Sequence, residues 1–171
     1  FLKKTKVDLV VVGPEKPLAA GLVDFIQDVC YCVGPTKSLA KIESSKSFAR
    51  NIMENNRYLS KYSPQYVVFK NITNEKLHDS MIQAENFISR FDNKVVVKVD
   101  GLAGGKGVKV WGVHIHTKVE LLNLINGYLL DNTSIIIEEK LIGEEFSLIS
   151  FTDGTGFIHA PPVLDFKLLQ D

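Results

Sequence analysis

Lysines and glycines with the chemistry to hold phosphate gather in one stretch, VVVKVDGLAGGKGVKVW, residues 95–111. Lys98 stands inside an apolar run, where a buried lysine needs a partner, and a bound phosphate would be that partner. The glycines that follow can adopt positive φ and bring backbone N–H groups close to an anion. The stretch therefore favours phosphate binding. The alternative is an exposed hairpin with Lys98 on a solvated face.

Spacing excludes two common phosphate loops. A P-loop requires G-x-x-x-x-G-K-[ST] before a helix, but Asp100 replaces its first glycine and Gly107 follows Lys106. The dinucleotide fingerprint requires a third glycine, and that position holds Val110. Because residues 108–113 alternate like a strand, we predict a strand–turn–strand hairpin.

A second candidate stretch is IIIEEKLIGEEFSLI, residues 135–149. Its apolar run ends at Glu138 and Glu139, which suits a hinge that hydrogen-bonds a purine edge through backbone groups. Glu145 would then accept hydrogen bonds from sugar hydroxyls. An ordinary strand with a solvated acidic end is the alternative interpretation.

Composition narrows the class of protein. Lys plus Arg and Asp plus Glu number 20 each and apolar residues make up 45%. The apolar share is enough for a packed core. The equal numbers of basic and acidic residues argue against a nucleic-acid or membrane-surface binder, which would normally have a basic excess. No apolar run approaches the roughly 18 residues that span a bilayer. The start, FLKKTKVDL, has neither an initiator methionine nor a signal-peptide layout. We expect an internal piece of a longer cytoplasmic protein, with Cys30 and Cys32 as unpaired thiols.

The elements that position these residues follow from hydrophobic periodicity. Residues 7–13 and 30–34 read as strands around a helix opened by Pro17, with an apolar face of Leu18, Leu22, Phe25, Ile26 and Val29. This is a βαβ unit, interpreted as the trailing edge of an α/β domain. Two short helices are expected within 34–56, with Thr36 and Ser44 as N-caps.

The order of the elements expected across residues 65–130, β-α-β-β-α, predicts a small α+β unit. Thr117 and Glu120 form a capping box for a helix that runs to about residue 130. The remaining expected elements are a strand over 65–69, a helix over 74–90, the two strands of the hairpin, and strands within 134–154 that turn near Asp153-Gly154.

Together these segments resemble the ATP-grasp superfamily, and within it the family of phosphoribosylamine–glycine ligases, also called glycinamide ribonucleotide synthetases. The matching blocks occur in the family's order and cover most of the chain: 8–24, 34–50, 96–110, 135–147 and 161–167. The resemblance implies a partial ATP-grasp fold, α/β and α+β, behind the trailing βαβ part of an α/β domain. It implies an N-terminal substrate part, a helical connector, a lid subdomain and the start of a central subdomain, at 1–35, 36–60, 61–130 and 131–171.

The resemblance also implies roles for single residues. Lys46 and Lys98 match the nucleotide-contacting, phosphate-stabilising lysines, and no side chain is expected to act as a nucleophile. The implied ATP contacts further include the turn Gly104, Gly105, Lys106 and Gly107, the adenine hinge Glu138, Glu139 and Leu141, and Glu145 at the ribose. The implied substrate contacts are Glu15, Asp165 and Lys167, beside Phe166 where the family usually has histidine.

The activity implied by the resemblance is ATP-driven joining of glycine to 5-phosphoribosylamine through a glycyl phosphate, a step of purine biosynthesis. ATP and Mg²⁺ or Mn²⁺ are the expected cofactors, with metal ligands outside this chain. This chain alone is expected to be inactive, and further domains of a larger polypeptide are expected partners. Two alternatives stay open: another ATP-grasp ligase or carboxylase, and an inactive nucleotide-binding fragment.

Overall fold

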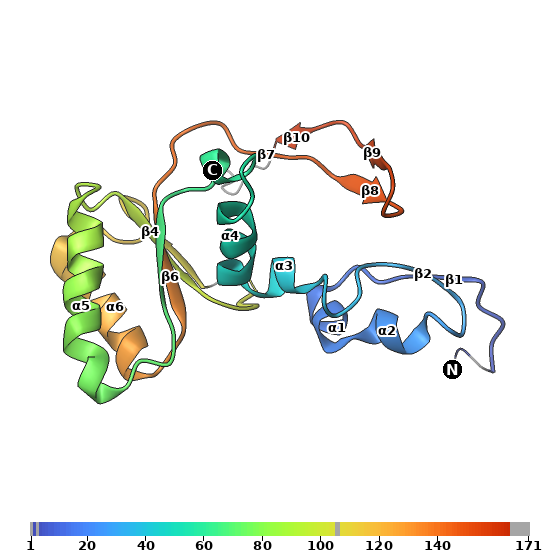
Figure 1. Ribbon diagram of the computed structural model, residues 1–171, viewed down its shortest axis with the longest axis horizontal. Helices are drawn as coiled ribbons and strands as arrows, with labels where there is room; N and C mark the ends of the chain where they lie inside the picture. Colours follow the sequence, from blue (N-terminus) through green and yellow to red (C-terminus); the bar gives the residue numbers. More distant parts are fainter. Residues whose placement is uncertain (1, 3, 105–106, 165–171) are drawn as a thin grey trace, which may run out of the picture. The chain divides into compact units, whose positions relative to one another are not determined.

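The computed structural model of the chain describes residues 2, 4–104 and 107–164. It contains mixed helices and strands (Figure 1), as the sequence predicts. The chain divides after Lys140 into two compact units, residues 1–140 and 141–171. The four domain ranges expected from the sequence stay a prediction.

The first unit begins with the predicted βαβ arrangement. β1 (Leu9–Val11) pairs in parallel with β2 (Tyr31–Val33), and the segment between them is helical. The single helix expected there is wrong, because Gly21 adopts a left-handed φ of 92° and separates α1 (Glu15–Ala20) from α2 (Leu22–Ile26).

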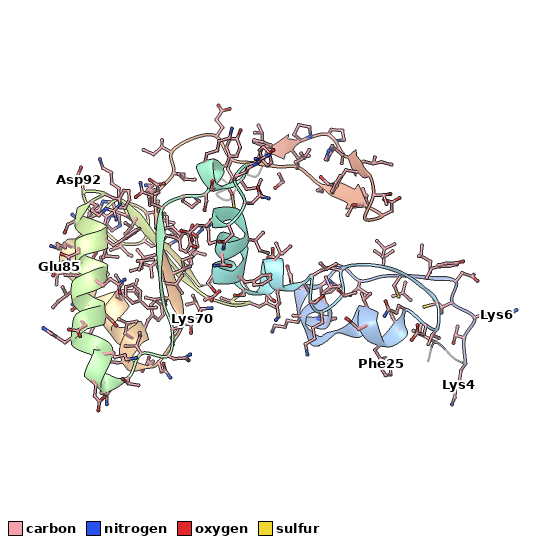
Figure 2. All side chains as sticks on the ribbon, viewed as in Figure 1. Lys4, Lys6, Phe25, Lys70, Glu85 and Asp92 are labelled. Carbon is pink, nitrogen blue, oxygen red and sulfur yellow. The ribbon has the colours of Figure 1, made fainter. Side chains whose placement is uncertain are left out.

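The break at Gly21 also changes which apolar side chains of this segment are covered. Val23 and Ile26 are buried, whereas Phe25, expected on the covered face, is 82% exposed and labelled in Figure 2. The expected apolar face is therefore only partly correct.

Two short helices follow, α3 (Lys41–Ser44) and α4 (Lys46–Glu54), and then the 3-10 turn η1 (Ser60–Tyr62). The N-cap of α4 is Ser45, whose hydroxyl accepts from the Phe48 backbone N–H, so the expected cap at Ser44 is wrong by one residue. Thr36 is not the N-cap of α3 either, since that position is taken by Ala40.

The centre of the first unit is a four-stranded antiparallel sheet in the order β3-β6-β4-β5. Its strands are β3 (Tyr66–Phe69), β4 (Val95–Val99), β5 (Val108–Val110) and β6 (Ile135–Glu139). Helices α5 (Asn74–Ser89) and α6 (Lys118–Leu130) connect the strands. The predicted Thr117–Glu120 capping box is confirmed at the start of α6.

Alternation along the strands gives the sheet two different faces. Val95 and Val97 of β4 and Ile135 and Ile137 of β6 are fully buried in one core with α5 and α6. Each fully buried residue of this size contributes about 2 kcal/mol. The intervening side chains point to the opposite face, where Lys98 and Glu138 contact each other outside the core formed with α5 and α6. Figure 1 shows α5 and α6 on one side of the sheet and α4 on the other.

The second unit contains short, exposed strands. β7 (Phe146–Ser147) pairs with β10 (Val163–Leu164), and β8 (Ser150–Thr152) pairs with β9 (Phe157–His159). The predicted turn after Thr152 is confirmed: the carboxylate of Asp153 accepts from the N–H groups of Thr155 and Gly156, which lowers its pKa to about 2.

Two features outside the sheet complete the description. Cys30 and Cys32 are free thiols, as predicted. Within the described part of the chain, every helix is too short or too polar to cross a membrane.

Candidate functional site

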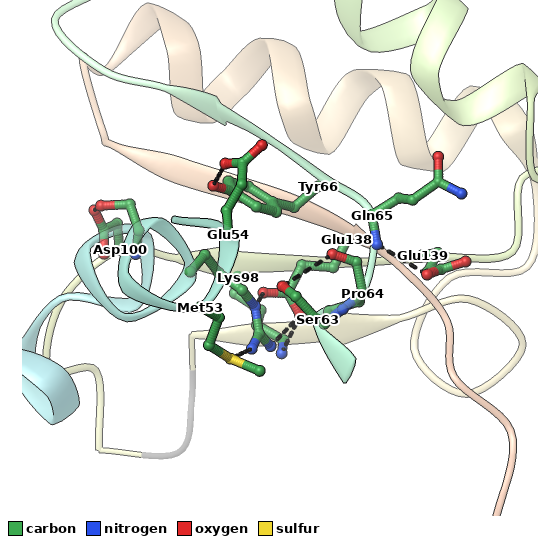
Figure 3. Close-up of polar contacts among 12 residues, drawn as sticks. Met53, Glu54, Ser63, Pro64, Gln65, Tyr66, Lys98, Asp100, Glu138 and Glu139 are labelled. Atoms are coloured by element: carbon green, nitrogen blue, oxygen red, sulfur yellow. Dashed lines mark hydrogen bonds and ion pairs between the residues drawn. The ribbon is translucent and has the colours of Figure 1, made fainter. Parts of the chain in front are cut away.

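Lys98 of β4 contacts Glu138 of β6 on the face of the sheet where α4 docks (Figure 3). Its Nζ donates to Glu138 Oε2 at 2.6 Å. The two residues are diagonal neighbours on adjacent strands, a spacing that a long side chain can bridge. Arg50 of α4 completes the cluster, with Nε 2.6 Å from Oε1 and Nη2 3.0 Å from Oε2.

Glu138 is the buried member of this cluster. Its side chain is 4% exposed, against 21% for Arg50 and 23% for Lys98. Burial by itself would raise the pKa of Glu138, but the hydrogen bonds from Arg50 and Lys98 outweigh it and hold the pKa below its ordinary value. Lys98 therefore already has a carboxylate partner in Glu138, and its contact with a phosphate stays a prediction.

A second buried carboxylate, Asp100, lies just after β4. Its side chain is 4% exposed and 2.6 Å from Lys70 Nζ. It also accepts from the backbone N–H and hydroxyl of Ser47 and, more weakly, from the hydroxyl of Ser45. Burial tends to raise the pKa of Asp100, and the hydrogen bonds from Lys70 and Ser47 override it and lower the pKa. Asp100 thus ties the first turn of α4 to the end of β4.

Lys46, the first residue of α4, lies against the glycine-rich turn. Its Nζ donates to the Gly101 carbonyl at 2.8 Å. Lys46 and the turn border one cavity of about 320 Å³. The lining residues are Glu15, Lys16, Glu43, Lys46, Gly101, Leu102, Ala103, Gly104, Gly107 and Val108. The fold therefore brings together four residues singled out in the sequence: Glu15, Lys46, Gly104 and Gly107.

Two glycines of this turn are required for different reasons, one for its backbone conformation and one because there is no space for a side chain. Gly104 adopts a left-handed φ of 56°. At Gly107 the demand is space, because a Cβ there would lie 2.5 Å from the Ala103 Cβ. The Val99 N–H donates to the Gly107 carbonyl at 2.8 Å, which closes the base of the turn. The predicted hairpin is confirmed, while Gly105 and Lys106 lie outside the described residues.

Among the described residues of the first unit, the predicted site residues Lys98, Glu138 and Glu139 do not line this cavity. The carboxylate of Glu139 accepts from the Gln65 backbone N–H at 2.8 Å, and β3 thereby stays attached at that end of β6. Leu141 and Glu145 belong to the second unit. Asp165 and Lys167, with Phe166 between them, lie outside the described residues.

A larger cavity, about 620 Å³, lies beside β3 and α5 and contains none of the predicted site residues. Its polar lining includes Gln65, whose side chain accepts from Arg90 at 2.6 Å. Size alone does not make a binding site. We place the candidate site at the smaller cavity, because Lys46 and the glycine-rich turn supply it with anion-binding groups.

Metal-binding side chains are not clustered in the described part of the chain. No three His, Cys, Asp or Glu residues there are grouped so that they could hold an ion.

Two family models match consecutive parts of the chain. The ATP-grasp (A) domain of phosphoribosylglycinamide synthetase matches residues 44–171, and the N domain of the same enzyme matches residues 1–43. The chain belongs to the phosphoribosylglycinamide synthetase family.

Curated relatives of this family member come from archaea and animals. Phosphoribosylamine–glycine ligases of Methanobrevibacter smithii and Methanosarcina barkeri are 38% and 40% identical over 96% and 98% of the chain. The trifunctional purine biosynthetic protein adenosine-3 of Gallus gallus is 38% identical over the whole chain and is covered to 16% of its own length. The chain spans 36% of the length of each of the two archaeal relatives.

Solved structures show that the family member has an ATP-grasp fold. Phosphoribosylamine–glycine ligase from Thermotoga maritima superposes with a TM-score of 0.65 at 28% identity, over 97% of this chain and 38% of that one. D-alanine–D-alanine ligase from Bacillus anthracis, at 13% identity and a TM-score of 0.60 over 98% of this chain and 57% of that one, shares the fold alone.

Sequence reasoning missed two residues of the ion clusters beside β4, Arg50 and Asp100. Arg50 had a usable signal, because it follows Lys46 by four residues and so lies on the same helical face. The only sequence signal for Asp100 was its position between the strand and the glycines of the turn. Neither signal names a partner, since Glu138 is 88 residues from Arg50, and Ser47 and Lys70 are 53 and 30 residues from Asp100.

Proposed function

We propose that the full-length protein is an ATP-dependent ligase that joins glycine to 5-phosphoribosylamine, giving glycinamide ribonucleotide, ADP and phosphate. The family membership and the names of the curated relatives support this activity. The structural observation that carries it is the gathering of Lys46 and the glycine-rich turn around one cavity. Such a cavity suits a polyphosphate.

In this proposal the chain supplies position and positive charge. Phosphoryl transfer requires in-line placement and neutralisation of the charge on the phosphoryl oxygens. Lys46, Lys98 and the turn residues Gly104, Gly105, Lys106 and Gly107 would hold the triphosphate. A glycine carboxylate oxygen bonds to the γ-phosphorus and ADP leaves. The substrate amine then attacks the glycyl carbonyl, and phosphate leaves.

The remaining contacts belong to the same proposal. Glu138, Glu139 and Leu141 would hold adenine mainly through backbone groups, and Glu145 would accept from the ribose. Glu15 would contact the sugar substrate, and its place beside Lys46 at the cavity supports this role. Asp165 and Lys167 are the other proposed substrate contacts.

Mg²⁺ or Mn²⁺ is proposed as the cofactor metal, bound by groups outside the described residues. The partners are proposed to be the small-molecule substrates and further domains of the same polypeptide, with no nucleic acid or membrane. We place the protein in the cytoplasm. Residues 1–171 alone are expected to be inactive, since they span about a third of a relative's length.

The decisive assay measures ADP release from ATP by the full-length protein with glycine and 5-phosphoribosylamine. ADP should form only when both are present, with glycinamide ribonucleotide appearing in equal amount. Glycine is replaced by D-alanine or bicarbonate in parallel reactions, which tests the alternative ATP-grasp ligase and carboxylase activities. ADP release without glycine dependence would overturn the substrate assignment, and ATP binding without any turnover would favour the inactive nucleotide-binding module.

A further inference from the structure

The ion cluster of Arg50, Lys98 and Glu138 carries an excess of positive charge. Lys98 and Glu138 together are neutral, so this pair alone would attract a phosphate only weakly. Arg50 adds a second cation to the same carboxylate. Within these three residues, two cations and one anion give a net charge of +1, and each cation is about a fifth exposed. The carboxylate of Glu54, one turn further along α4, contacts neither cation and accepts from the Tyr66 hydroxyl.

The geometry of Arg50 determines how Glu138 is held. The guanidinium donates to both carboxylate oxygens, through Nε at 2.6 Å and Nη2 at 3.0 Å. Such a two-bond fork fixes the plane of a carboxylate, which a single ammonium cannot do. Nη1 also contacts Met53 Sδ at 3.5 Å, so the guanidinium is itself restrained. The Oε2 atom that Lys98 contacts is therefore held in place by Arg50.

Arg50 also connects the two lysines that are proposed to contact ATP. It lies one helical turn after Lys46 on α4, and residues four apart share a helical face. Lys46 reaches the turn after β4, whereas Arg50 reaches β6 and, through Glu138, Lys98. One helix thus sets the positions of both lysines relative to the sheet.

We propose that Arg50 is a positioning residue for ATP binding. It orients Lys98 through Glu138, and it keeps the cluster net positive so that Lys98 attracts the polyphosphate despite its carboxylate partner. This inference rests on the proposed function only in taking ATP as the ligand.

The test compares variants of the full-length protein by calorimetric titration with a non-hydrolysable ATP analogue. Arg50→Met removes the charge and both hydrogen bonds, and should weaken analogue binding about tenfold, the usual scale for losing a charged hydrogen bond. The KM for glycine should not change. Lys118→Met is the matched control, because it removes a lysine from an exposed pair with Glu85 on the helical side of the sheet and should bind the analogue like the wild type.

A double-variant cycle separates this role from simple structural support. Removing the carboxylate charge with Glu138→Gln makes the second cation unnecessary. The double variant Arg50→Met/Glu138→Gln should therefore bind the analogue more tightly than Arg50→Met alone. A residue that only stabilises the fold would give further weakening instead, and that result would overturn the proposal.

A third variant keeps the inference testable if Arg50→Met does not fold. Arg50→Lys keeps the charge but loses the fork, and should weaken analogue binding about threefold, less than full removal of the side chain. Unchanged affinity in Arg50→Met or, if that variant does not fold, in Arg50→Lys contradicts the inference. Failure of the proposed ligase activity looks different, because the wild type would bind the analogue yet release no glycine-dependent ADP.

Discussion

Two buried carboxylates on the same face of the sheet are satisfied in different ways. Glu138 contacts two cations, Arg50 and Lys98. Asp100 contacts one cation, Lys70, and accepts its other hydrogen bonds from serines at the start of α4. The Glu138 cluster therefore has a net charge of +1, whereas the Asp100 cluster is neutral.

The difference indicates separate tasks for the two clusters. A neutral cluster with backbone and hydroxyl donors is sufficient to dock a helix on a strand. An excess cation near a buried carboxylate adds nothing to docking, since it also loses hydration. It is useful where an anion is to be bound. We therefore associate Asp100 with the placement of α4 and Glu138 with the charge of the site.

The largest expected effect on stability is that of Glu138→Ala. The change leaves Arg50 and Lys98 close together without their shared carboxylate, and should lower the free energy of unfolding by about 3 kcal/mol. Denaturant titration of the full-length protein measures it. Glu85→Ala, which breaks the exposed pair with Lys118, is the control and should cost less than about 0.5 kcal/mol. Equal effects of the two changes would refute the distinction between buried and exposed pairs.

A smaller loss is expected for Asp100→Asn. The amide keeps an oxygen for Ser47 but loses the charge opposite Lys70, which is 42% exposed and regains water easily. The free energy of unfolding should fall by about 1.5 kcal/mol. The same titration applies, and analogue affinity should stay near that of the wild type. A large loss of affinity would show that Asp100 belongs to the charge of the site after all.

The smallest effect is a dependence of stability on pH. The pKa values of Glu138 and Asp100 in the folded protein lie below their ordinary values of 4.5 and 3.8. The unfolded chain therefore binds more protons in acid, so stability is full above these ordinary values and falls as the pH drops through them. Denaturation between pH 3 and 7 should show this fall, and it should be shallower in Glu138→Gln. An identical slope in that variant would mean that Glu138 does not contribute.

The sheet and its two helices could be predicted from sequence because their signals are local. An apolar run identified the strand that contains Lys98, alternation identified the strand after the glycines, and the Thr117–Glu120 pair identified the start of α6. The helix after Pro17 was harder, because the left-handed Gly21 interrupts an apolar pattern that continues beyond it. Local pattern does not show such a break.

The partners within the site could not be predicted in the same way. Lys98 was identified as a site residue, but its contact with Glu138 depends on β6 pairing with β4. That pairing joins segments 40 residues apart and is chosen by the packing of the whole sheet. Arg50 depends further on where α4 docks. Side-chain roles that arise from three separate elements are not visible in any one of them.

The position of β6 in the sheet has a consequence for the order in which the protein is assembled. Among the described strands, β3 pairs only with β6, and β6 lies between β3 and β4. During synthesis the hairpin of β4 and β5 can form early, while β3 waits about 70 residues for its neighbour. Its edge is open to wrong pairing for that time. Insertion of β6 completes the sheet and, in the same step, delivers Glu138 to Arg50 and Lys98.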